Sequence, residues 1–341
     1  MNRSKIEWCD HTWNPITGCR HECSYCYARA MAARFAGDVR MNKMAKADYQ
    51  LVDSADGSAE VYCLEKPMKN ETGNLLGYPF GFEPTYHRYR MDTLDKLKMG
   101  NNIFVGAMAD VFGKWVPEMW ITDILGACMK RPKHNYMFLT KNPERYSELH
   151  EAGKLPEADN MFYGATVTQG AQLERATRVF TDLPDSFHTF FSIEPILEDI
   201  TACKIWEDAV LQVDWIIVGA QTGHGKDKVV PEMEWIKKIV VSADEEYSVP
   251  VFMKDSLTPV VSEKNMRRDF PKALQRRMVS EKMRNRLYAE CSRCKVYLKK
   301  SDMIALLARS KRGEQPKQFV FMCKDCFVGF CMELGIDVPK M

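Results

Sequence analysis

The chain has 341 residues, of which 45% are hydrophobic and 28% are charged, and its formal net charge is +2. This composition is typical of a globular protein with one large domain or two smaller ones. The nearly balanced charge neither indicates nor excludes a nucleic-acid partner for the whole chain. No apolar run approaches the ~20 residues needed to cross a bilayer, and the first residues lack the apolar segment of a signal peptide. We therefore expect a cytoplasmic protein with no membrane partner.

The twelve cysteines are unusually numerous, and most of them lie in short clusters. In a cytoplasmic chain such clusters indicate metal ligands rather than disulfides, because thiols are kept reduced there. The clustered cysteines are Cys19, Cys23 and Cys26 near the start, and Cys291, Cys294, Cys323, Cys326 and Cys331 near the end. The scattered ones, Cys9, Cys63, Cys128 and Cys203, are expected to be small buried side chains.

The segment before the first cysteines predicts a short strand and a turn, over residues 6–18. From Ser24 to Phe35 the apolar residues recur at helical spacing, and Gly37 is placed to end a helix. Cys26 would then lie in the first turn, where the positive end of the helix dipole favours a thiolate.

Residues 38–100 are rich in turn-forming residues and indicate an insertion. A helix is expected at its end, from Tyr86 to Leu97. The sequence assigns no function to this insertion.

From residue 102 onwards, apolar runs alternate with helical patterns that begin near Pro117, Pro143, Gln169 and Pro231. The six runs are Asn102–Ala107, Tyr136–Thr140, Met161–Val167, Phe187–Ile193, Asp214–Val218 and Val249–Met253. Such alternation predicts right-handed βαβ units and a parallel sheet. With the opening strand there are seven strands, too few for a closed eight-unit barrel. We predict an α/β fold with a partial (β/α) barrel, and spacing alone leaves a doubly wound open sheet as the alternative.

Polar residues follow each of these six runs, at the point where a strand would end. They are Ala109-Asp110, Lys141-Asn142, Thr168-Gln169, Glu194-Pro195, Ala220–Gly223 and Lys254-Asp255. In parallel α/β folds the active site lies at the carboxyl ends of the strands. Because the first cysteines also follow a strand, we expect them on the same rim, which indicates an enzyme. The alternative for each polar residue is an ordinary solvated loop.

A basic stretch covers residues 263–287, with nine Lys or Arg against three acidic residues. Such a surplus suits a surface that contacts phosphates, but it is also common on a solvated helix or linker. The stretch marks a boundary between predicted domains: a partial barrel over 1–258, a basic linker or helix over 259–290, and a four-cysteine tail over 291–341.

The tail contains two C-x2-C pairs, Cys291 with Cys294 and Cys323 with Cys326. Four soft ligands with no open position suit a structural zinc site, so we predict a small zinc-ribbon-like domain. A second iron–sulfur cluster is the alternative, since four cysteines serve it equally well. Cys331 is expected to be a buried thiol.

The first three cysteines have a C-x3-C-x2-C spacing, with Tyr25 just before the last one. Three thiolates can converge on one metal centre and leave one coordination position open. We interpret them as ligands of a [4Fe–4S] cluster with one iron free to bind a cofactor. The alternatives are a zinc site completed by His11, His21 or Cys9, or three unrelated thiols.

This motif, placed after the first strand of a partial barrel, resembles the radical S-adenosylmethionine superfamily. The resemblance implies a [4Fe–4S] cluster and S-adenosylmethionine, reductive cleavage to a 5′-deoxyadenosyl radical, and hydrogen abstraction from a substrate. It also implies an external electron donor, flavodoxin-like or ferredoxin-like. The oligomeric state is not indicated.

A closer resemblance, over most of the first 255 residues, is to a phage-associated radical-SAM-like family described only by its three-cysteine motif and unknown function. It rests on Trp8–Pro15, Ala109-Asp110, Leu139–Pro143, Ser192–Pro195, Ile217–Ala220 and Val251–Lys254. It implies a phage-encoded protein in the host cytoplasm and gives no substrate.

The superfamily resemblance implies roles for residues on the rim. Tyr25 would contact the adenine of the cofactor. The candidates for holding its methionine and ribose parts are Asp110, Lys141, Thr168, Glu194 and Gln221. Ala107-Met108-Ala109-Asp110 stands where the superfamily has Gly-Gly-Glu.

Spore photoproduct lyase shares the C-x3-C-x2-C spacing. Together with the basic stretch and the tail, this parallel makes DNA or RNA the substrate class that we expect for modification or repair. The alternative function is a non-catalytic, metal-bearing protein that binds nucleic acid. No residue that returns a hydrogen to the product is identified by the sequence.

Overall fold

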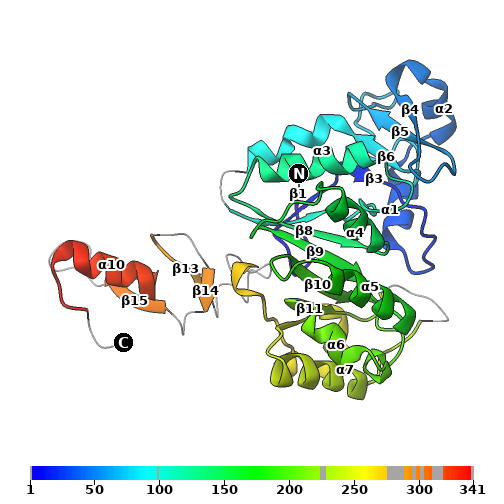
Figure 1. Cartoon of the computed structure of the whole chain (residues 1–341). Coiled ribbons are helices and arrows are strands. Elements are labelled where there is room, and N and C mark those ends of the chain that lie inside the picture. Colours follow the sequence, from blue (N-terminus) through cyan, green and yellow to red (C-terminus); the bar gives the residue numbers. More distant parts are fainter. Residues whose placement is uncertain are drawn as a thin grey trace. The chain divides into compact units, whose positions relative to one another are not determined.

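The computed structural model of the chain describes residues 2–97, 100–222, 228–274, 288–293, 297–299, 303–308 and 318–338. The chain divides into two compact units (Figure 1). The first comprises Met1–Arg3 and His11–Pro271, and the second Ser4–Asp10 and Lys272–Met341. Among the described helices, none combines the length and the apolar character needed to span a membrane.

The first unit is built on an eight-stranded sheet with the order β1-β2-β7-β8-β9-β10-β11-β12. Its strands are β1 (Asn2–Arg3), β2 (His11–Trp13), β7 (Asn102–Val105), β8 (Asn135–Thr140), β9 (Met161–Thr166), β10 (His188–Ile193), β11 (Trp215–Val218) and β12 (Val251–Met253). The seven strands from β2 to β12 are parallel, and β1 is antiparallel to β2. Each parallel strand lies beside the preceding parallel strand of this sheet, and the sheet is curled into a half-barrel. The predicted partial barrel is confirmed, and the doubly wound alternative is wrong.

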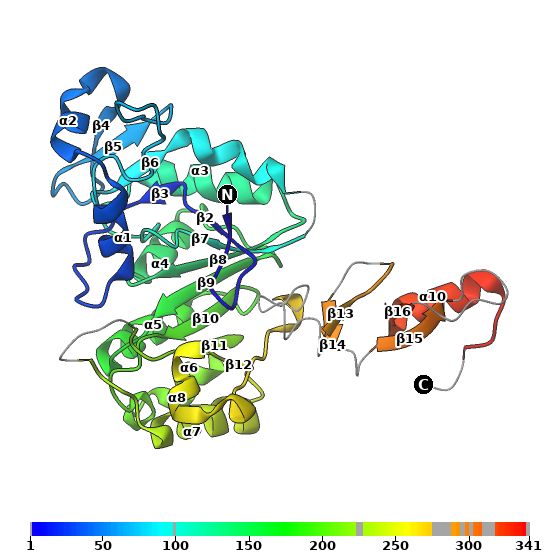
Figure 2. The ribbon, with the colours of Figure 1, turned by 180° about the vertical axis from the view of Figure 1, so that it is seen from behind.

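Helices connect the successive parallel strands and cover the outside of the half-barrel (Figures 1 and 2). They are α3 (Glu118–Met129), α4 (Glu144–Glu151), α5 (Gly170–Asp182), α6 (Trp206–Leu211) and α7 (Met233–Val240). The short α8 (Thr258–Val261) follows the last strand, β12. Shorter helical turns are η3 (Ile200–Ala202), η4 (Val241–Glu246), η5 (Asp255–Leu257), η6 (Glu263–Asn265) and η7 (Lys272–Leu274). As predicted, α3 and α4 begin directly after Pro117 and Pro143.

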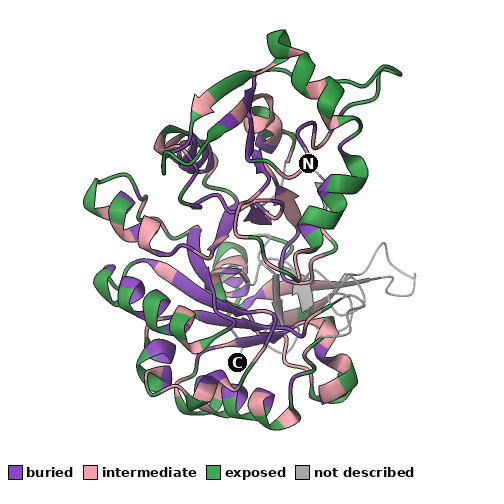
Figure 3. Ribbon diagram, turned by 90° about the vertical axis from the view of Figure 1, so that its right-hand side faces the viewer, coloured by how far each residue is buried: buried purple, intermediate pink, exposed green. Residues whose placement is uncertain are grey.

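The core lies between these helices and the sheet. Alternate strand residues such as Ile103, Phe138 and Tyr163 belong to one cluster with helix residues such as Ile124 and Phe180. Figure 3 shows the strands almost wholly buried, whereas the helices have one buried and one exposed side. Burial on both faces explains why the strands are nearly continuous apolar runs in the sequence.

The insertion folds as a second, four-stranded sheet with the order β3-β6-β5-β4. Its elements are β3 (Ile16–Thr17), β4 (Gln50–Asp53), β5 (Glu60–Leu64), β6 (Thr85–His87), α2 (Val39–Met44), η1 (Lys46–Asp48) and η2 (Arg88–Lys96). The helix predicted from Tyr86 to Leu97 is confirmed only in part, because the segment starts as β6 and continues as the 3-10 helix η2. Tertiary contacts override the local pattern: Tyr86 stacks on Trp120, and buried His87 hydrogen-bonds Thr17.

The helix after the first cysteines, α1, runs from Tyr27 to Phe35. It begins later than predicted because the N–H of Cys26 donates to the carbonyl of Cys23 in a turn, 3.2 Å away. Cys26 has an extended backbone and is the N-cap residue, so its expected place in the first helical turn is wrong. Cys26 still stands directly before the N-terminus of α1, which is the positive end of the helix dipole.

In its described residues the second unit contains two β-hairpins, the short helical turn η7 and one longer helix. The hairpins are β13 (Tyr288–Glu290) with β14 (Tyr297–Lys299), and β15 (Met303–Ala308) with β16 (Gln318–Cys323). The helix α10 (Lys324–Leu334) follows β16 directly, and its N-cap is Cys323. The second C-x2-C pair therefore begins a helix instead of forming a turn between strands, and the predicted zinc ribbon is not confirmed.

Candidate metal and cofactor site

The loop that carries the first three cysteines is fixed where it begins, at Gly18 and Cys19. Gly18 forms a parallel bridge with Ala109, and its N–H donates to the carbonyl of Met108, 2.9 Å away. The N–H of Cys19 donates to the carbonyl of Phe82 in the insertion, 3.1 Å away. Gly18 has φ +88°, and a Cβ there would lie 2.2 Å from the carbonyl oxygen of Glu83. Only glycine allows the loop to pass so close to the insertion.

The thiols of Cys19, Cys23 and Cys26 are all partly buried and form no disulfide. Burial and, secondarily, the charge of Asp110 raise the pKa of Cys19 to about 12, although the backbone N–H of His21 lowers it by a hydrogen bond. The charges of Cys23 and Cys26 also raise this pKa, because the three sulfurs are neighbours. A thiolate at Cys19 therefore needs a cation beside it, which a bound metal centre supplies.

The spacing of these sulfurs differs from that of a single-ion site. Among the described residues, the group of metal-ligand atoms that all lie within 4.8 Å of one another is in the tail and does not include this triad. In an iron–sulfur cluster each thiolate binds a different iron, so the ligands stand further apart than around one ion. The structure therefore does not place these three sulfurs as ligands of one ion.

His21 lies inside the cysteine loop and contacts Asp110 and Trp115. Its Nε2 is 2.7 Å from Oδ2 of Asp110, and its ring packs edge-on against Trp115 with 4.9 Å between the centroids. Cys9, another candidate for a fourth ligand, donates its thiol proton to the Ser4 hydroxyl, 3.2 Å away. The Cys9 contact weakens the alternative of a zinc site completed by that residue. The contact of His21 does not, because a histidine that binds a metal commonly holds a carboxylate with its other ring nitrogen.

Asp110 connects the cysteine loop to the end of β8. Besides His21, its Oδ2 accepts hydrogen bonds from Thr140 Oγ1 and from the backbone N–H of Lys141, both at 2.9 Å. Its Oδ1 accepts the N–H of Phe112 at 3.0 Å, and the side chain is buried. Sequence reasoning placed Asp110 among the cofactor-binding candidates. In the structure its oxygens are occupied by the protein's own donors.

Tyr25 of the cysteine loop and Lys141 at the end of β8 are in contact. Lys141 Nζ donates to the Tyr25 hydroxyl at 3.0 Å, and the same ammonium lies 5.4 Å from the centre of the tyrosine ring. The contact joins the residue before Cys26 to the end of β8, and it brings together two of the residues that the sequence singled out.

Glu194 and Lys254, at the ends of β10 and β12, form an ion pair. Gly219, at the end of β11 between these two strands, makes room for it, since a Cβ there would lie 3.2 Å from the Glu194 side chain. Lys254 was not among the predicted site residues. Its position directly after a buried strand was the available signal.

The other two candidates have local partners. Both the N–H and the hydroxyl of Thr168 donate to Oε1 of Gln172, at 2.6 and 2.9 Å, which ties the residue to the start of α5. Oε1 of Gln221 accepts the N–H of Val229 at 3.2 Å. The structure therefore gives each a stabilising role in its own loop.

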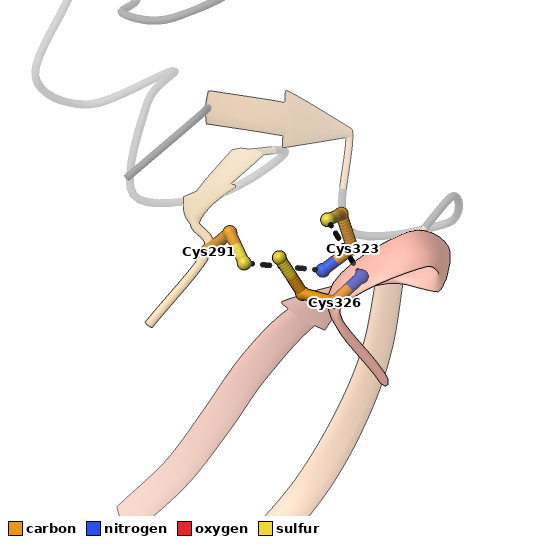
Figure 4. A group of neighbouring side chains, drawn as sticks. All are labelled: Cys291, Cys323 and Cys326. Carbon is orange, nitrogen blue, oxygen red and sulfur yellow. Dashed lines mark hydrogen bonds between the residues drawn. The ribbon is translucent and has the colours of Figure 1, made fainter. Parts of the chain in front are cut away.

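The tail brings three cysteines together (Figure 4). The sulfurs of Cys291, Cys323 and Cys326 all lie within 4.8 Å of one another. The N–H of Cys323 donates to the sulfur of Cys291, and that of Cys326 to the sulfur of Cys323, both at 3.4 Å. This group could bind a metal ion. Cys294 lies outside the described residues, and Cys331 is a buried residue of α10.

Part of the basic stretch contributes to the fold. Arg267 lies 3.2 Å from Asp244, and Arg268 pairs with Asp255 and donates to the carbonyl of Met253. These contacts fix the segment beside β12. The cations Arg276, Arg277, Lys282, Arg284 and Arg286 lie outside the described residues.

The scattered cysteines largely follow their prediction. Cys9, Cys63 and Cys128 are buried, whereas Cys203 is only partly buried.

Comparison with known proteins identifies a family whose function is unknown. Residues 3–285 match the model of a family whose description is "Protein of unknown function (DUF5131)". Among curated proteins no match is found. The matched span includes the cysteine loop, the insertion and the half-barrel, and it ends before the tail cysteines.

Proposed function

The chain belongs to the DUF5131 family, whose function is unknown, and we propose that it is a radical S-adenosylmethionine enzyme. In this proposal Cys19, Cys23 and Cys26 hold a [4Fe–4S] cluster. The cluster would supply one electron that cleaves S-adenosylmethionine to a 5′-deoxyadenosyl radical, which abstracts hydrogen from a substrate.

The supporting observation is the cysteine loop itself. Three neighbouring, partly buried thiols lie beside the strand ends of a parallel half-barrel, the edge at which such folds place their active sites. The motif supplies three cysteines within eight residues, which leaves one ligand position of a four-ligand shell open. A structural zinc site would normally close its shell with a fourth ligand.

The chain's own residues would then have distinct tasks. Lys141 holds the Tyr25 hydroxyl, which orients the ring that we assign to the adenine, and its ammonium is placed to attract a carboxylate. Glu194, paired with Lys254, could accept hydrogen bonds from ribose hydroxyls. Thr168 and Gln221 would shape the neighbouring loops. We assign Asp110 to positioning of the cysteine loop because its oxygens already accept hydrogen bonds from the protein.

Nucleic acid is the substrate class that we propose, with modification or repair as the outcome. Residues 263–287 carry the positive charge that would suit phosphates.

For the tail we propose a structural zinc ion on Cys291, Cys323 and Cys326 with Cys294 as the fourth ligand. Backbone N–H groups directed at sulfur, as found there, stabilise thiolates.

Anaerobic reconstitution with iron and sulfide tests the proposal. The protein should take up about four irons per chain beyond any zinc and, with dithionite, convert S-adenosylmethionine to 5′-deoxyadenosine. Cys23→Ala should lose the cluster and the cleavage. Cys203→Ala, which removes a partly buried thiol of the same unit, should retain both.

A colourless protein that carries only zinc after anaerobic purification would contradict the enzyme. If that protein bound DNA or RNA, the non-catalytic alternative would replace it. Retained cleavage in Cys23→Ala would refute the ligand assignment.

A further inference from the structure

Helices α1 and α2 present apolar side chains to solvent directly after the cysteine loop. Met31 and Phe35 of α1 are 42% and 50% exposed, and Met41 and Met44 of α2 are 54% and 74% exposed. Residues three or four positions apart lie on one face of a helix, so each helix carries an apolar stripe. We call these four residues, together with the exposed cations Arg34, Arg40 and Lys43 of the same two helices, the α1–α2 surface. Figures 1 and 2 both show the two helices along the same edge of the first unit.

The α1–α2 surface is also strongly basic. From Tyr27 to Lys46 the chain has five cations, Arg29, Arg34, Arg40, Lys43 and Lys46, and one acid, Asp38. The Asp38 carboxylate is the N-cap of α2, where it accepts the N–H groups of Arg40 and Met41 at 2.9 and 3.2 Å. Arg34, Arg40 and Lys43 are exposed. The charge of the surface is therefore not balanced by the segment's own acid.

The surface lies close to the proposed cluster. Cys26 is the N-cap of α1, and a helix rises about 1.5 Å per residue. Met31 is therefore about 8 Å along the helix from the last cysteine. The rate of electron transfer falls steeply with distance, so a donor that docks here would be near the acceptor.

We infer that the α1–α2 surface is the docking site of an acidic redox protein that delivers the electron to the cluster. This inference rests on the proposed function. In the step one electron leaves the reduced donor and enters the cluster, so the donor is oxidised and the cluster reduced, with no bond or proton transferred.

The side chains favour a protein partner over a nucleic acid. Methionine and phenylalanine supply an adaptable apolar centre, as at other protein-binding surfaces. The cations around them complement an acidic partner and speed its encounter. Transient redox complexes bury little area, which suits two short helices.

The test compares two reductants of the reconstituted enzyme by stopped flow at low salt. The triple variant Arg34→Glu/Arg40→Glu/Lys43→Glu should be reduced by an acidic flavodoxin hydroquinone at least about tenfold more slowly than the unmodified protein, because charge steering is reversed. Reduction by dithionite, a small ion, should change less than about threefold. The control Arg178→Glu/Lys204→Glu/Lys237→Glu makes the same change of net charge at exposed positions on other helices or loops and should behave as the unmodified protein.

An unchanged rate with flavodoxin, in a variant that still cleaves S-adenosylmethionine with dithionite, would overturn the docking site and leave the proposed function standing. An equal slowing by the control variant would also overturn it, since net charge would then be the cause. If instead the triple variant lost affinity for DNA or RNA with normal flavodoxin kinetics, the surface would bind nucleic acid. A protein that takes up no cluster would overturn the function and the docking site together.

Discussion

The imidazole of His21 and the carboxylate of Asp110 lie 2.7 Å apart although 89 residues separate them in the sequence. Through this contact the cysteine loop is tied to the end of the half-barrel. Because Asp110 also accepts from Thr140 and from the backbone of Lys141, one buried carboxylate aligns the loop with the strand end that carries Lys141.

Replacing Asp110 with alanine should cost about 3 kcal/mol of unfolding free energy, because several buried donors lose a charged acceptor. Urea denaturation of the metal-free protein measures this loss, and reconstituted iron should fall in parallel. Asp214→Ala is the matched control. That carboxylate also pairs with a histidine, His188, but its side chain is 45% exposed, so water can replace it and the loss should stay below about 1 kcal/mol. Equal losses in the two variants would contradict the central position of Asp110.

Alkylation should report the raised pKa of Cys19. With a pKa of about 12, caused first by burial and then by Asp110, the thiolate fraction at pH 8 is on the order of 10⁻⁴. Iodoacetamide should therefore modify Cys19 of the metal-free protein slowly at pH 8 and about 100-fold faster at pH 10. Peptide mapping by mass spectrometry gives both rates. Cys128, which is buried, should remain unmodified throughout. Labelling of Cys19 at pH 8 as fast as free cysteine would show that its thiol is not perturbed.

Gly164 in β9 should not tolerate a side chain. A Cβ at this position would lie 2.2 Å from the ring of Phe190 in the adjacent strand, and overpacking of this kind costs about 1–3 kcal/mol. Gly164→Ala should lower the urea midpoint, and adding Phe190→Leu should recover part of the loss. Gly126→Ala provides the control within α3, where no atom lies within 4 Å of the added Cβ. It should stabilise the protein slightly, by up to about 1 kcal/mol. The prediction fails if both glycine variants change stability in the same direction.

Cys326 and Cys331 lie on the same helix but should respond differently to substitution. Cys326→Ser should lose the tail metal, because this sulfur belongs to the three-thiol group. Cys331→Ser should keep about one zinc per chain, since its sulfur is outside that group. Metal analysis and limited trypsin digestion of the tail measure the difference. Bound iron that depends on Cys326 would indicate a second cluster, and unchanged zinc in Cys326→Ser would exclude this residue as a ligand.

Much of the half-barrel is predictable from the sequence. Its strands are buried on both faces, so Met161–Thr166 and His188–Ile193 appear as apolar runs within a residue of their observed bounds. The insertion is not predictable in this way. Its β6 forms because Tyr86 stacks on Trp120 and His87 bonds Thr17, contacts between residues far apart in the chain.

The same distinction between local patterns and contacts made by the fold applies to the candidate site. The spacing of Cys19, Cys23 and Cys26 is local and can be recognised directly. The structure adds partners that only the fold creates, such as Lys254 for Glu194 and His21 for Asp110. A strand-end position identifies a residue as part of the rim. It does not show whether the side chain already forms a hydrogen bond or ion pair with another residue of the protein.

At both edges of the parallel half-barrel sheet, the outermost parallel strand is hydrogen-bonded to another segment of the chain. β1 pairs with β2 at one margin, and at the other the carbonyl of Arg267 accepts the N–H of Met253 while the N–H of Asp269 donates to Val251. The margins therefore cannot join each other to complete a barrel. They also offer fewer unpaired amide groups to a neighbouring molecule, so edge-to-edge stacking of sheets should not be the route by which this protein aggregates.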